Sequence, residues 1–121
     1  MKIFVTHSSN FDFVNELYRP LRESNLGFSH DFIFPHEMKE GISTKEIIKS
    51  SDLVLAEVSY PSTGSGIELG WADMFAKPII CISKEGSKVS KSLDKITSNF
   101  ISYRDSDDMI AKLNTALATM K

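Results

Sequence analysis

Cysteine, membrane-spanning segments and net charge are scarce or missing in this chain. One cysteine, Cys81, stands among 121 residues, which excludes an internal disulfide and fits a reducing cytoplasm. No apolar run approaches the ~20 residues that span a bilayer, and the opening stretch 1–5 is too short for a signal peptide. The formal net charge of −2 gives no overall attraction to nucleic acid or to anionic lipid. We therefore expect a cytoplasmic protein with no nucleic-acid or membrane partner.

Strand-like and helix-like segments alternate along the chain. A length of 121 residues and a hydrophobic share of 41% suit one globular domain over residues 1–121. Strands are expected at 2–6, 28–34, 53–58, 78–83 and 100–103. Helices are expected between them, with a weak helix at 89–96 and a closing helix whose apolar face runs from Met109 to Met120. This alternation predicts an α/β fold with one doubly wound, mainly parallel five-stranded sheet in the flavodoxin-like order 2-1-3-4-5.

Two helices carry specific expectations. Pro20 is expected to distort the second half of the first helix, which Asn25 and Gly27 should end. The helix after the third strand is expected to bury one side, made of Ile67, Trp71, Met74 and Phe75.

Two loops are expected to meet at the carboxyl edge of the sheet. In such sheets, ligands bind where the strand order reverses, here between the first and third strands. The loop 7–10 follows the first strand, and the loop 59–66 follows the third. Glu57 ends that third strand, and the sequence leaves open whether its carboxylate is structural or part of a site.

The most informative acid is Glu68, which is expected in the first turn of the helix after the third strand. A carboxylate there can attack an anomeric carbon or stabilise an oxocarbenium-like transition state. Ser62 offers a hydroxyl to sugar or phosphate, and Gly64 and Gly66 let a ligand approach the backbone closely. The alternative is a capping box, in which Ser65 begins the helix and Glu68 completes the cap. The two interpretations are compatible.

The stretch DLVLAEVSYPSTGSGIELGWADMFAKPIICI resembles the signature of the nucleoside 2-deoxyribosyltransferase superfamily. It is most similar to the 2'-deoxynucleoside 5'-phosphate N-hydrolase branch, which has an AEV-x-x-PS-x-G-x-G-x-ELG-x-A run. MKIFVT and IFPHE resemble the family's first strand and the end of its second strand. The resemblance implies a deoxyribonucleoside or deoxyribonucleotide N-glycosidase or transferase.

The resemblance also implies roles for single residues. Glu68 matches the nucleophile that attacks C1' of the deoxyribosyl group. Ser62 and Ser8 match phosphate-contacting serines. Ser90 or Ser92 matches a further serine that reaches the phosphate in a neighbouring subunit's site. The family usually forms dimers or larger assemblies, so a homodimer or higher homo-oligomer is expected, with the sites near subunit interfaces.

Three positions depart from the family pattern. Phe4 stands where the family has an active-site tyrosine, and Asn10 where the hydrolases have a phosphate-binding arginine. Thr44 stands where the hydrolases have an acid that positions the sugar and serves the leaving base. His7 and His36 follow the first and second strands, and an imidazole there could protonate a leaving base near pH 7.

Two other functions remain open. THSSNFDFVNELYRPL resembles the opening of Toll/interleukin-1 receptor domains, many of which cleave nicotinamide from NAD with a helix-borne glutamate. The missing tyrosine, arginine and acid are also compatible with a nucleotide-binding module that has lost catalysis. No His, Cys or Asp spacing indicates a metal, and no cofactor is expected. The sequence leaves open the base, the phosphorylation of the 5' position, and whether water or a second base is the acceptor.

Overall fold

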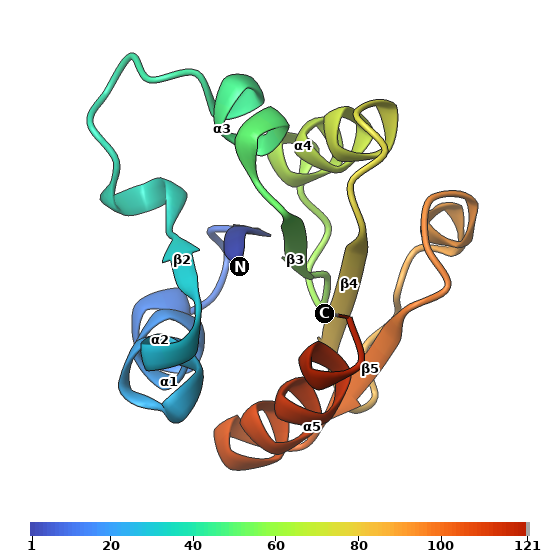
Figure 1. The fold of residues 1–121 in the computed structure, drawn as a ribbon. Helices are drawn as coiled ribbons and strands as arrows, with labels where there is room; N and C mark the ends of the chain where they lie inside the picture. The colour runs from blue at the N-terminus through green and yellow to red at the C-terminus, as the bar shows by residue number, and fades with distance from the viewer. Residues whose placement is uncertain (121) are drawn as a thin grey trace.

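Five parallel strands form one sheet in the order β2-β1-β3-β4-β5 in the computed structural model, which describes residues 1–120 (Figure 1). The strands are β1 Lys2–His7, β2 Asp31–Ile33, β3 Leu53–Glu57, β4 Ile79–Lys84 and β5 Phe100–Tyr103. The α-helices are α1 Arg19–Glu23, α2 Asn25–Ser29, α3 Thr44–Ser50, α4 Thr63–Met74 and α5 Ser106–Ala118. The predicted fold class and strand order are confirmed.

Helices cover both faces of the sheet (Figure 1). On one face, α1 and α5 bury the side chains of Val5, Leu55 and Ile82. On the other face, α3, α4 and the 3-10 turn η3 Lys91–Lys95 pack around Val54 and Cys81. Successive strand residues point to opposite faces, so the centre of the sheet is apolar on both sides. Cys81 is buried, and this burial raises the pKa of its thiol to about 11.

The segment after β1 differs from the expected single helix. It opens with the π-helical turn η1 Val14–Tyr18, in which the N–H of Arg19 donates to the carbonyl of Val14. The distortion expected in the second half is not present, because Pro20 lies in the first turn of the regular helix α1, where its missing N–H is tolerated, and the irregular turn precedes it.

The chain between α1 and β2 was predicted wrongly. The expected strand 28–34 is shortened to β2, because α2 continues to Ser29 and leaves Phe28 90% exposed. The Ser24 side chain accepts the N–H of Leu26 and starts this second helix. Gly27 does not end the first helix. A Cβ at Gly27 would lie 2.2 Å from the carbonyl oxygen of Arg22, so the two helices approach closely only because no side chain stands there.

The predicted buried side of α4 is also wrong in part. Ile67 is 50% exposed and Met74 64% exposed, whereas the buried residues are Ser65, Leu69 and Ala72. These three follow the spacing of one helix face. The expected weak helix at 89–96 is reduced to the short turn η3.

Candidate active site

The helix α4 begins earlier than the sequence indicates. Ser62 is its N-cap and accepts the N–H of Ser65 at 3.3 Å. Glu68 therefore lies in the second turn, not in the first, and the expected capping box of Ser65 with Glu68 is not formed. Of the two side chains in the expected capping box, Ser65 is buried and Glu68 lines a cavity.

Glu68 lines a cavity of about 260 Å³ at the carboxyl edge of the sheet, between the ends of β1 and β3. The helix α4 contributes Gly64 and Ser65 to the same wall, and its N-cap Ser62 lies beside them. Across the cavity, the wall is made of His7, Ser9, Pro35 and His36. This is the position where the strand order reverses, so the predicted meeting of the two loops is present.

A threonine that the sequence analysis missed holds the Glu68 carboxylate. Thr6 Oγ1 lies 2.7 Å from Glu68 Oε1 and 2.8 Å from Ser65 Oγ. Thr6 is fully buried in β1, and Ser65 is 7% exposed. A polar residue in an otherwise apolar strand was the available signal. The contact between Thr6 and Glu68 depends on the three-dimensional packing of α4 against β1, which the sequence pattern does not show.

His7 lines the cavity but has both ring nitrogens occupied. Nδ1 lies 2.7 Å from the carbonyl oxygen of Ser8, which can only accept, so Nδ1 carries the hydrogen. Nε2 lies 2.5 Å from the Tyr18 hydroxyl and accepts from it. Burial lowers the pKa of His7 and raises that of Tyr18. This neutral imidazole supports the wall and is not placed to protonate a leaving base.

His36 is the exposed imidazole of the cavity. It lies in the 3-10 turn η2 Pro35–Glu37 after β2, and its backbone N–H donates to the Tyr18 hydroxyl at 3.4 Å. Its ring centroid is 4.6 Å from that of Phe13 and 5.1 Å from that of His7. Aromatic neighbours thus fix the position of a ring that remains open to solvent and faces the same space as Glu68.

Seven predicted site residues lie outside the wall that surrounds Glu68, and four of these line neither this cavity nor the neighbouring one. Phe4 is fully buried in the hydrophobic core under α3 and α4. Ser8 is 2% exposed, and its hydroxyl accepts the N–H of Asn10. Asn10 is exposed next to it, and Thr44 is the first residue of α3. The backbone thus places the loop 8–10 beside the cavity, with Ser9 at its wall.

Ser90 and Ser92 line a second cavity, of about 410 Å³, on the other side of the start of α4. Gly66 lies on its wall, whereas Gly64 faces the Glu68 cavity. The Ser90 hydroxyl accepts the N–H of Ser92 and caps η3. The two cavities share Ser62 and Ser65 and are therefore neighbours. The predicted site residues that line a cavity are divided between the two.

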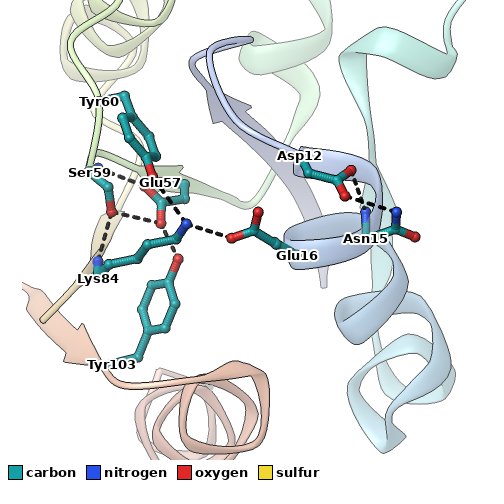
Figure 2. A network of polar contacts seen from close by, with 8 residues as sticks. All are labelled: Asp12, Asn15, Glu16, Glu57, Ser59, Tyr60, Lys84 and Tyr103. Carbon is teal, nitrogen blue, oxygen red and sulfur yellow. Dashed lines mark hydrogen bonds and ion pairs between the residues drawn. The ribbon is translucent and has the colours of Figure 1, made fainter.

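The second acid at this edge, Glu57, is enclosed in a polar cluster (Figure 2). It is 1% exposed. Its carboxylate accepts the N–H of Ser59 at 2.6 Å, the Ser59 hydroxyl at 3.0 Å and the Tyr103 hydroxyl. Lys84 borders the cluster, where its Nζ donates to Glu16 at 2.5 Å and to the Tyr60 hydroxyl at 3.1 Å. Glu57 thus has the partners of a structural carboxylate.

The described residues contain no group of three or more His, Cys, Asp or Glu side chains that could hold a metal ion. Within residues 1–120, none of the helices combines the length and the apolarity that a membrane span requires.

No protein-family model matches the chain. It is 31% identical over 93 residues to a protein from Thermofilum pendens that carries the provisional name 2'-deoxynucleoside 5'-phosphate N-hydrolase 1. The match covers 67% of this chain and 65% of that protein, so the chain spans just under two thirds of the length of this curated relative.

Two solved structures have the same fold. One is a CMP N-glycosidase from Clostridium botulinum, with a TM-score of 0.67 and 23% identity, covering 94% of this chain and 99% of that one. The other is a 2-deoxyribosyltransferase from Bacillus psychrosaccharolyticus, with a TM-score of 0.64 and 19% identity, covering 90% of each chain.

Proposed function

We propose that this chain belongs to the nucleoside 2-deoxyribosyltransferase superfamily and cleaves or transfers an N-glycosidic bond, which its sequence similarity and its fold support. The substrate is a deoxyribonucleoside or its 5'-monophosphate, and Glu68 is the nucleophile. The observation that carries the proposal is the setting of Glu68. Its half-buried carboxylate is held by one hydroxyl and faces a cavity where the strand order reverses. That combination suits a group that must bind a reacting carbon.

The reaction proceeds in two displacements. A Glu68 oxygen attacks C1', the bond from C1' to the base nitrogen breaks, and its electron pair leaves with the base, which takes up a proton. Water or a second base then attacks C1', the bond from C1' to the Glu68 oxygen breaks with its electron pair returning to the carboxylate, and the attacking group gives its proton to the group that protonated the first base. A covalent intermediate of this kind divides one difficult displacement into two easier ones.

His36 is the group we propose as the proton donor to the departing base. It shares the cavity with Glu68, and an imidazole can act as a general acid. It would supply the acid that Thr44 lacks. General acid catalysis contributes roughly 10²- to 10⁴-fold, so His36→Gln should lower kcat by roughly that factor when base release is measured.

Ser62 is the group we propose as a contact for a 5'-phosphate. Its hydroxyl accepts a bond from the start of α4 and keeps its own hydrogen as a donor. Ser62→Ala should therefore raise KM for a 5'-monophosphate by about 10-fold, the worth of one charge-assisted hydrogen bond. KM for the unphosphorylated nucleoside should stay within about twofold, because no such bond is lost.

We also propose that the chain acts as a homodimer or larger homo-oligomer in the cytoplasm. The Glu68 cavity, at about 260 Å³, is smaller than typical small-molecule sites of 300–1,000 Å³. Ile67 and Met74 leave an apolar face of α4 exposed, and a second subunit could cover it. Sedimentation equilibrium tests this state, and a monomer at all concentrations would contradict it.

The test of the function is base release by the wild type and by Glu68→Gln. Each is incubated with deoxynucleosides, their 5'-monophosphates, CMP and NAD, and free bases are separated by chromatography. We expect base release by the wild type and no release by Glu68→Gln. The matched control is Glu23→Gln, on the exposed side of α1, which should release base as the wild type does. Nicotinamide release from NAD alone would favour the Toll/interleukin-1 receptor-like alternative.

Two results would overturn the proposal. Undiminished release by Glu68→Gln would remove the nucleophile assignment. Absence of release from every substrate, together with nucleotide binding by calorimetry, would indicate a binding module.

A further inference from the structure

We infer that Thr6 and Ser65 position the Glu68 carboxylate for reaction. This inference rests on the proposed function of Glu68. The positioning device consists of two hydroxyl groups in series, one from β1 and one from α4. It fixes Oε1 of Glu68 and leaves Oε2 as the attacking oxygen. Thr6 and Ser65 are positioning residues and do not touch the substrate's reacting atoms.

The direction of the two hydrogen bonds follows from counting hydrogens. Thr6 Oγ1 is within hydrogen-bond distance of both Glu68 Oε1 and Ser65 Oγ, at 2.7 and 2.8 Å. A hydroxyl has one hydrogen, and an ionised carboxylate can only accept. The Thr6 hydrogen must therefore point to Glu68, and Ser65 is left to donate to Thr6. Ser65 thereby fixes the rotation of the Thr6 hydroxyl.

The device is anchored in rigid surroundings. Thr6 is fully buried, and its position in β1 pairs with Ala56 of β3 in the centre of the sheet. Ser65 is buried on α4, and its N–H is bound by the N-cap Ser62. The nucleophile is thus tied both to the sheet and to its own helix, which limits the rotamers that its side chain can adopt.

The other carboxylate oxygen, Oε2, has no hydrogen-bond donor among the residues that the structure describes, 1–120. One oxygen is held, and Glu68 lines a cavity that has room for a ligand. A nucleophile kept in place before the substrate arrives saves the entropy of ordering it in the transition state. The expected signature is therefore an effect on kcat rather than on KM.

The first experiment compares base release by the wild type, Thr6→Val, Thr6→Ser and Ser65→Ala. Thr6→Val keeps the shape and removes the hydroxyl. It should lower kcat by roughly 10- to 100-fold, with KM within about threefold. Thr6→Ser restores the donor and should return kcat to within about threefold of the wild type. Ser65→Ala should lower kcat by only about threefold, because Thr6 keeps its bond to Glu68.

The matched control is Thr97→Val. Thr97 is half-buried, and its hydroxyl donates to the carbonyl of Ile79 at the opposite edge of the sheet. This variant loses a comparable hydroxyl without contact to Glu68, so kcat should stay within about twofold. A kcat for Thr6→Val equal to that of the wild type, or a failure of Thr6→Ser to recover, would overturn the inference.

A second measurement does not depend on activity. Thermal unfolding is compared for the wild type, Thr6→Val, Glu68→Ala and the double variant. Thr6→Val should lower the melting temperature less in the Glu68→Ala background than in the wild type, because the shared bond is already lost. Additive shifts would overturn the pairing. Absence of base release by the wild type would refute the proposed function and leave the unfolding cycle as the test of the pairing.

Discussion

Two glutamates stand at the same edge of the sheet, and their partners differ. Glu57 is buried and receives three hydrogen bonds, from the Ser59 backbone, the Ser59 hydroxyl and the Tyr103 hydroxyl (Figure 2). Glu68 is half-buried and receives one, from Thr6. An ionised carboxylate has about four acceptor positions, so Glu57 is nearly saturated and Glu68 is not.

Under the proposed function, this difference separates a structural acid, Glu57, from a reactive one, Glu68. A buried carboxylate is tolerated only when donors replace the water that it has lost. A carboxylate that attacks carbon needs an oxygen with no protein donor and a space for the substrate in front of it. Burial alone would favour Glu57 as the functional acid, whereas the number of hydrogen-bond donors favours Glu68.

Of the four changes that test this comparison, shortening the proposed nucleophile should have the largest effect. Glu68→Asp keeps the charge and withdraws the carboxylate by one methylene, away from C1' and from Thr6. We expect kcat for base release to fall roughly 100-fold, the penalty of about 1 Å of misplacement. The free energy of unfolding should change by less than about 1 kcal/mol, since one half-exposed hydrogen bond is altered. Kinetics and urea unfolding measure the two quantities, and a collapse of stability would erase the contrast with Glu57.

Neutralising Glu57 should have the opposite profile. Glu57→Gln keeps the shape but weakens the bonds from Ser59 and Tyr103, which should cost about 1–3 kcal/mol of unfolding free energy. The value of kcat per folded molecule should stay within about twofold, because Glu68 and Thr6 are not in this cluster. A large loss of kcat at full folding would mean that Glu57 belongs to the active site after all.

His7 offers a pH test of a third buried group. Burial holds its pKa below the ordinary value of 6.5, so the unfolded chain binds the proton more readily than the native one. Stability should therefore fall as pH drops below 6.5, by at most about 1.4 kcal/mol per pH unit for one proton. Urea unfolding between pH 7.5 and 5 measures this slope. His7→Gln should flatten this slope.

The sequence was sufficient for the features that depend on local patterns. The alternation of strands and helices predicted the sheet order, since parallel strands need crossover helices. Glu68 could be selected as a candidate nucleophile from the sequence, because the residues of its motif are contiguous in the chain. The start of α4 was placed too late, because Thr63 and Gly64 are poor helix formers. The Ser62 cap and the burial of Ser65 against β1 override that propensity.

The features that the sequence could not supply depend on long-range contacts. Thr6 and Glu68 are 62 residues apart, so their hydrogen bond follows only from the register of β1 beneath α4. The partners of Glu57 likewise come partly from Tyr103, 46 residues away. Helical periodicity predicted one buried side of α4, but two of its residues, Ile67 and Met74, are exposed.

Removing the neighbouring cation should have the smallest effect. Lys84 borders the Glu57 cluster, but its Nζ pairs with Glu16 at 2.5 Å, with side chains 30% and 42% exposed (Figure 2). Partly exposed ion pairs contribute about 0.2–1 kcal/mol, so Lys84→Met should lower the unfolding free energy by no more than that. Methionine keeps apolar contact with the rings of Phe11 and Tyr60, and salt should reduce the difference from the wild type. Urea unfolding at low and high salt measures both effects. A loss as large as that of Glu57→Gln would mean that the Lys84 charge compensates the Glu57 carboxylate, and neutral donors alone would no longer explain why that acid can be buried.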